Sequence, residues 1–144
     1  MTPGTVCCDN NFQFLDGSSG KKIIISLSKV DQNSYLFVKT TSKEIYKGKI
    51  SGCQLNDRYP NFFIPQKTSF LTLDTWVMLN EFYEIKLENL FKKRTVSEMQ
   101  HIGQLEESTT IQLLKCAIGS KDIQGNHQKA LSNTLHSFAS DFVF

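Results

Sequence analysis

Lysines and aromatic residues that could bind nucleic acid lie close together in the first half of the chain. Seven lysines occur between positions 21 and 49, against two acidic residues in the same stretch. Lysine ammonium groups contact phosphates, and aromatic rings stack on unpaired bases. The predicted binding residues are Lys22, Lys29, Tyr35, Phe37, Lys39, Lys47, Lys49 and Lys67. These residue types in this arrangement favour single-stranded nucleic acid, DNA or RNA, as the ligand.

The assignment of the two aromatic residues depends on which face of their strand meets solvent. Tyr35, Phe37 and Lys39 alternate with Leu36 and Val38, so the two sets occupy opposite faces of an extended segment. Alternation alone does not say which set faces the core, and a shift of one residue exchanges the faces. A core position for the aromatic residues and a purely solvated role for the lysines therefore remain alternatives.

The residues that most often serve catalysis or metal binding show no productive spacing. The four cysteines are Cys7, Cys8, Cys53 and Cys116, and they include no CxxC pair. We expect them to be free thiols, and we expect no metal or cofactor. The three histidines have no nucleophile or ligand at a useful spacing, and the adjacent acids Glu106 and Glu107 fit the start of a helix. We therefore expect a protein that is not an enzyme.

The segments that carry these side chains predict an α+β fold. Strands are expected at 22–29, 35–43, 45–50 and 62–71, and together they would form a four-stranded curved antiparallel sheet. Thr72 has the character of a helix cap, and a 3.6-residue apolar pattern follows it, which predicts a long amphipathic helix over 72–93. Trp76 is expected to pack this helix on the sheet. The predicted dimer interface on its outer face consists of Leu79, Tyr83, Leu87 and Leu90.

Three regions follow from these elements. Residues 1–20 are rich in turn formers and predict a flexible N-terminal arm, residues 21–94 form the sheet-plus-helix domain, and residues 95–144 form a mostly helical C-terminal extension. The chain has a net charge of +2, and we find no secretory leader or apolar run long enough to cross a bilayer. We expect an intracellular protein.

The segment from 63 to 76, Phe-Ile-Pro-Gln-Lys-Thr-Ser-Phe-Leu-Thr-Leu-Asp-Thr-Trp, resembles the transcriptional coactivator family called positive cofactor four. In that family a proline- and lysine-containing turn leads to a strand end, a capping residue and a helix with a tryptophan in its first turn. Lys67, Leu71, Thr72 and Trp76 match these positions, while Pro65 lies one position away. With the hairpin at 21–43, the resemblance covers roughly the middle half of the chain.

The resemblance implies a nuclear, non-catalytic homodimer that holds single-stranded DNA in concave channels and acts in transcription or replication. The second strand ends in Thr-Thr-Ser-Lys where the family has Arg-Glu-Tyr-Trp, and residues 45–61 and the tail after Arg94 have no counterpart. These departures favour a divergent viral relative. The alternative function is a protein-interaction or assembly module that binds partners through the helix face and the apolar tail Phe138, Phe142, Val143 and Phe144.

Overall fold

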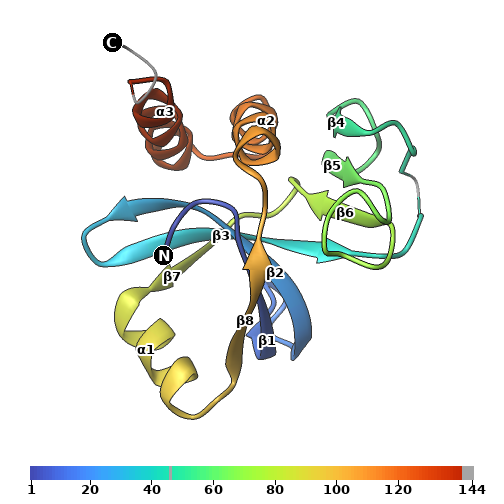
Figure 1. The fold of residues 1–144 in the computed structure, drawn as a ribbon. Helices are drawn as coiled ribbons and strands as arrows, with labels where there is room; N and C mark the ends of the chain where they lie inside the picture. Colours follow the sequence, from blue (N-terminus) through green and yellow to red (C-terminus); the bar gives the residue numbers. More distant parts are fainter. Residues whose placement is uncertain (46, 141–144) are drawn as a thin grey trace.

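The computed structural model describes residues 1–45 and 47–140, which form one sheet with helices on both sides (Figure 1). The strands are β1 (Thr5–Gln13), β2 (Ser19–Asp31), β3 (Ser34–Thr41), β4 (Gly52–Gln54), β5 (Asn61–Ile64), β6 (Thr75–Met78), β7 (Tyr83–Lys86) and β8 (Met99–Gln104). The helices are α1 (Leu87–Thr95), α2 (Glu107–Ile118) and α3 (Gly125–Ser140).

All strand pairs are antiparallel, and the sheet has the order β4-β5-β6-β3-β2-β1-β8. The long strand β3 has two partners on the same edge, because its first half pairs with β7 and its last two residues pair with β6. Figure 1 shows α2 and α3 together on one side of the sheet and α1 on the other.

The two faces of the sheet bury separate apolar clusters. On the side of α2 and α3, alternate residues such as Ile25, Leu27, Leu36 and Val38 form the larger cluster with side chains from both helices. The opposite residues of the same strands form a second cluster, which includes Ile24, Phe37 and, from α1, Leu90. Burial of both faces explains why β2 and β3 contain nearly continuous apolar runs.

The predicted four-stranded sheet followed by one long helix is wrong. The segment expected to be a helix over 72–93 contains β6, a turn and β7, and α1 begins only at Leu87. Val77 and Leu79 point into the larger cluster, while Trp76 and Met78 point the other way with Phe63. This alternation with a period of two requires a strand, and the spacing of Trp76, Leu79 and Tyr83 fitted a helix by coincidence.

The boundaries of the other predicted elements also change. Residues 5–13, expected in a flexible arm, form β1 between β2 and β8, because Val6 and Cys7 bury their side chains in opposite clusters. The described part of 45–50 contains no strand, and β4 forms instead in the segment between the predicted strands 45–50 and 62–71. The strand predicted over 62–71 is β5 in the structure, and it ends at Ile64. Pro65 follows it and has no N–H group to donate to a neighbouring strand. The extension after residue 94 contributes β8 to the sheet as well as two helices.

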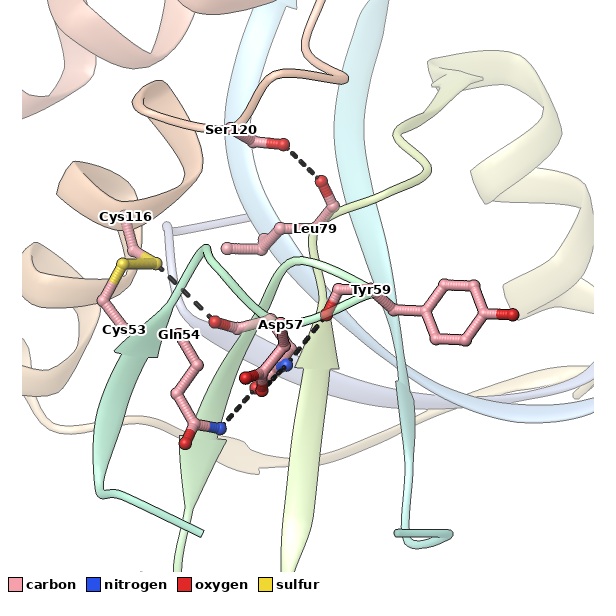
Figure 2. The surroundings of a disulfide bond; sticks show 8 residues. Cys53, Gln54, Asp57, Tyr59, Leu79, Cys116 and Ser120 are labelled. Atoms are coloured by element: carbon pink, nitrogen blue, oxygen red, sulfur yellow. Dashed lines mark hydrogen bonds between the residues drawn. A yellow bond between two sulfur atoms is a disulfide. The ribbon is translucent and has the colours of Figure 1, made fainter. Parts of the chain in front are cut away.

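A disulfide joins Cys53 of β4 to Cys116 of α2, so the expectation of four free thiols is wrong for this pair. The Cα atoms are 5.5 Å apart although 63 positions separate the residues in sequence, a distance that no spacing rule predicts. Figure 2 shows the bond beside Gln54 and Asp57. Both belong to a polar network with Asn61, in which Gln54 donates to Asn61 at 2.8 Å and Asn61 donates to Asp57 at 3.0 Å. Cys7 and Cys8 are free.

The connection between β6 and β7 is fixed to the helical layer as well. Ser120, just after α2, donates its hydroxyl hydrogen to the carbonyl oxygen of Leu79 at 2.6 Å (Figure 2). Leu79 itself is fully buried. No helix in the described ranges is both long and apolar enough to span a membrane.

Candidate nucleic-acid interface

A groove of about 330 Å³ opens where the beginning of β2 and the end of β3 meet the loop before β6. Its lining includes three lysines and five hydroxyl side chains. The lining residues are Lys21, Lys22, Ile23, Thr40, Thr41, Ser42, Lys43, Leu71, Thr72, Leu73 and Thr75. Ammonium and hydroxyl groups donate hydrogen bonds to phosphate oxygens, so the groove has the chemistry of an anion site.

The pairing of the strands places the lysines in this groove. Ile24 of β2 lies opposite Lys39 of β3 in an antiparallel ladder, so Lys21 and Lys22 approach the end of β3 and Lys43 beyond it. Thr40 and Thr41 pair with β6, and this pairing places the loop before β6, with Thr72, on the other wall of the groove. Residues that are distant in sequence therefore form one basic surface.

The charge of the groove is uncompensated within its own lining, because the three lysines are accompanied by no acidic residue there. Burial, together with the nearby positive charges of Lys39 and Lys43, lowers the pKa of Lys22 below its usual 10.5. A phosphate placed beside this half-buried ammonium group would relieve the repulsion and replace part of the lost hydration.

Three of the five hydroxyl groups in the groove are already bonded within the protein. Thr41 accepts the backbone N–H of Lys43 at 3.1 Å. Thr40 donates to the carbonyl oxygen of Ile23 at 2.8 Å, and Thr75 donates to that of Leu73 at 3.0 Å, so both stabilise the walls. Ser42 and Thr72 are exposed in the groove lining. These two are therefore the hydroxyls best placed to meet a ligand.

Lys39 lies beside the groove but is engaged within the protein. Its Nζ lies 2.8 Å from a carboxylate oxygen of Glu81 and 5.6 Å from the centre of the Phe14 ring. Burial raises the pKa of Glu81, but hydrogen bonds from Lys39 and from the Tyr83 hydroxyl outweigh it and leave that pKa below its usual value. Lys39 therefore contributes positive potential next to Lys22, while its own ammonium group is already paired.

The two predicted stacking residues do not present a ring to the groove. Phe37 is fully buried in the second cluster, and Tyr35 packs partly buried against the same cluster. Lys29 is exposed but pairs with Tyr35, seven positions along β2 from Lys22. Both faces of β3 are buried, because Leu36 and Val38 lie in the larger cluster and Phe37 lies in the second. Base stacking by Phe37 would therefore require unfolding of the core.

The remaining predicted lysines lie on other loops. Lys47 donates to the carbonyl oxygen of Ile45 and has its Nζ 6.0 Å from the centre of the Trp76 ring, and burial lowers its pKa. Lys49 is paired with Glu44 at 3.3 Å and with Asp74 at 3.7 Å. Lys67 is exposed with a φ of 66° in the loop after β5. None of the three lines the groove.

The four residues predicted as a dimer interface do not share an exposed face. Leu79, Tyr83 and Leu90 are 0%, 6% and 3% exposed, and they belong to two clusters on opposite sides of the sheet. Leu87, at the start of α1, is half-buried. The assignment depended on one long helix, and it fails because that helix does not exist.

Sequence reasoning missed Lys21, Lys43, Ser42 and Thr72 as groove residues. The signal for the first three was present, because an antiparallel hairpin over 21–43 necessarily places its two outer ends side by side. Thr72 carried no such signal, since its position depends on the pairing of β6 with β3. The groove therefore retains Lys22 alone from the predicted binding set.

In the described part of the chain, no group of three or more histidine, cysteine or acidic side chains is arranged to hold a metal ion. Comparisons with models of known protein families, with curated proteins and with solved structures find no match to this chain.

Proposed function

We propose that this protein binds single-stranded nucleic acid through phosphates held in the groove formed by Lys21, Lys22 and Lys43. The observation that carries this proposal is the presence of three lysines and no acid in the lining of one groove. All three lysines line one groove, and the same groove has exposed hydroxyl groups at Ser42 and Thr72.

The expected mode of binding is contact with the sugar-phosphate backbone. The groove lining contains no aromatic residue, so affinity must come from ammonium and hydroxyl contacts with phosphates. Each neutralised phosphate releases condensed counterions, and affinity should fall steeply with salt and depend little on base sequence. A flexible single strand can adjust the spacing of its phosphates to the groove, which a rigid duplex cannot do.

The test is fluorescence anisotropy with a labelled single-stranded oligonucleotide at several salt concentrations, comparing the protein with a Lys21→Gln, Lys22→Gln, Lys43→Gln triple variant. The matched control replaces three exposed lysines outside the groove, Lys115, Lys121 and Lys129, by glutamine. Loss of three phosphate contacts should flatten the log-log salt slope by about 2. The control variant should keep nearly the full slope, because its lysines are remote from the bound phosphates.

Two further ligands distinguish nucleic acid from other polyanions. A duplex of the same sequence tests the preference for single strands, and heparin tests whether sulfates replace phosphates in the groove. If the triple variant and the control lose the same affinity for the oligonucleotide, the groove is not the binding site. Tighter binding of heparin than of the oligonucleotide at equal charge would assign the groove to a sulfated polysaccharide instead.

A further inference from the structure

The outer edge of β7 is available to another strand. β7 pairs residue by residue with β3, from Tyr83 opposite Phe37 to Lys86 opposite Ser34. No strand in the described part of the chain pairs with its other edge. The unpaired N–H and C=O groups of an edge strand form a template for an extended segment. Any occupant that uses them must present its own backbone in a strand conformation.

Two hollows lie beside this edge. A cleft of about 580 Å³ lies between β1, β7 and α1, on the side to which Tyr83 and Ile85 point. A second hollow of about 600 Å³ lies where the β2–β3 turn, the end of β7 and the start of α1 meet. Its lining includes Glu84, whose carboxylate is 2.9 Å from Nε2 of His127 in α3. Glu84 lines both hollows, so they meet at the edge of β7.

This arrangement fits the geometry of an added strand. Successive side chains of a strand point to opposite faces. Tyr83 and Ile85 of β7 line the first hollow, and Glu84 and Lys86 line the second. A segment whose backbone pairs with the free edge would therefore place alternate side chains beside one hollow and then the other. A compact ligand that lacks this alternation would fill one hollow and leave the other empty.

The first hollow suits an apolar side chain. Phe12, Ile85 and Val96 supply apolar surface, and the carboxamides of Asn11, Gln13 and Asn89 line the cleft. The buried carboxylate of Asp9 is already neutralised by Lys93, whose Nζ lies 2.8 Å away. Carboxamides both donate and accept hydrogen bonds, as peptide groups require.

The second hollow suits a basic side chain. Its lining has three carboxylates, from Asp31, Glu84 and Glu88, against the single ammonium group of Lys86. Glu84 faces His127, but no basic residue of the described chain forms an ion pair with Asp31 or Glu88. The excess negative charge complements lysine or arginine.

We propose that β7 binds an extended peptide segment of a partner protein as an added strand, with an apolar side chain in the first hollow and a neighbouring lysine or arginine in the second. This goes beyond the proposed nucleic-acid binding and uses none of the lysines in that groove. The two activities are separable, because a basic peptide is repelled by the lysine groove and attracted by the acidic hollow.

The probe is a fluorescein-labelled nine-residue peptide in which valine and lysine alternate. It should bind at least tenfold more tightly than a peptide of alternating valine and glutamate, which tests the charge of the second hollow. N-methylation of alternate residues of the valine-lysine peptide should also weaken binding at least tenfold, because it removes the N–H groups that pair with β7. Backbone amide exchange at residues 83–86 should slow on binding.

The protein variant is Glu88→Lys, which should weaken binding of the valine-lysine peptide at least fivefold. Its matched control is Glu107→Lys, which changes the charge of another exposed acid in the first turn of a helix, away from both hollows. Equal affinities for the methylated and unmethylated peptides would refute strand addition. Equal effects of the two variants would refute the acidic hollow. A dimer by light scattering that dissociates on peptide addition would show that a second copy of the chain occupies the edge, and would overturn the proposal.

Discussion

The carboxylate of Asp9 has no solvent exposure and depends on one basic partner. Lys93 places its Nζ 2.8 Å from Oδ2 of Asp9 and also donates to the carbonyl oxygen of Asn11 at 2.9 Å. The other carboxylate oxygen accepts the backbone N–H of Asn11. This ion pair holds α1 against the irregular part of β1, where the register shifts between Asp9 and Phe12.

Lys93→Met is expected to lower the free energy of unfolding by about 3 kcal/mol, because it leaves the carboxylate of Asp9 buried and charged without an ion-pair partner. Urea denaturation followed by circular dichroism measures the loss. A double variant, Asp9→Asn with Lys93→Met, removes both charges and should lose less. If the single variant is as stable as the double variant, the ion pair does not hold this part of the fold.

The lowered pKa of Lys22 predicts that affinity for nucleic acid decreases at alkaline pH. Burial and two neighbouring lysines hold its pKa below 10.5, so in the free protein it loses its proton at a lower pH than an exposed lysine. Affinity for an oligonucleotide should therefore begin to fall at a pH below 10.5. The same depressed pKa disfavours the charged form on folding, so this group's contribution to stability rises as pH increases through the folded pKa towards 10.5.

The measurement is anisotropy between pH 7 and pH 10.5 at constant ionic strength. Lys22→Arg keeps the positive charge throughout this range and should move the fall in affinity to higher pH. Identical profiles for the two proteins would mean that Lys22 does not titrate in the binding site.

The type of a single residue did not show whether its side chain is free to bind a ligand. The type of Lys22 suggested a phosphate contact, but Lys39 and Lys49 look the same in sequence and are ion-paired in the fold. Glu81, the partner of Lys39, is distant along the chain, and Lys49 has one near partner, Glu44, and one distant partner, Asp74. Only the fold shows that these ammonium groups are already engaged. Likewise, Phe37 is buried because side chains of β1 and α1 pack on that face of β3.

At the level of elements, the disulfide connects β4, at one end of the strand order, to a helix that covers the sheet. β4 has only three residues and pairs only with β5 in the described fold. The bond closes a loop across 63 positions, and a loop of that length restricts the unfolded chain by about 4 kcal/mol in the chain-entropy account.

A Cys53→Ser, Cys116→Ser double variant is therefore expected to lose about 2 to 4 kcal/mol of unfolding free energy. Urea denaturation of the oxidised protein, the variant and the protein treated with dithiothreitol makes the comparison. Reduced protein and variant should agree with each other. Equal stability of all three would mean that the other contacts of β4 and α2 are sufficient.

Among the strands, the sequence located the β2–β3 hairpin best. The β2–β3 hairpin lies in the region expected for it, because alternation and a turn at Asp31 to Asn33 act locally. It failed at β6 and β7, where four-residue strands are too short to establish a period, and their apolar residues also satisfy helical spacing. It failed at β1 because Pro3, Gly4 and the polar run at 9–11 suggested loop, while pairing on both sides supplies the order.

The whole molecule has a core built from elements that are distant in sequence. The larger cluster brings together residues from Val6 to Leu131, and the fold ties the C-terminal helix to β2 through a hydrogen bond of 2.6 Å between the hydroxyls of Ser28 and Thr134. Elements from the expected arm, domain and extension therefore contribute to one core. Phe138 packs partly against this cluster, while Phe142, Val143 and Phe144 lie outside the described residues.

Leu79→Ala and Leu90→Ala are each expected to lower the free energy of unfolding by about 2 to 5 kcal/mol, because each opens a cavity in the interior of one chain. Light scattering should give the same mass for these variants as for the unchanged protein. If a variant has half the mass of the unchanged protein and the same stability, the substituted leucine lies in an interface between subunits and not in the core.

The disulfide also determines how the chain responds to force. A pull on the two ends is transmitted through Cys53 and Cys116, so the residues between them cannot extend while the bond is intact. An extended chain spans at most 3.3 to 3.6 Å per residue, and the 63-position separation therefore withholds about 220 Å of contour length. β5, β6, β7, α1 and β8 lie in this protected segment, whereas β1, β2, β3 and α3 bear the load. In an optical trap, adding a reductant should lengthen the fully unfolded chain by that amount.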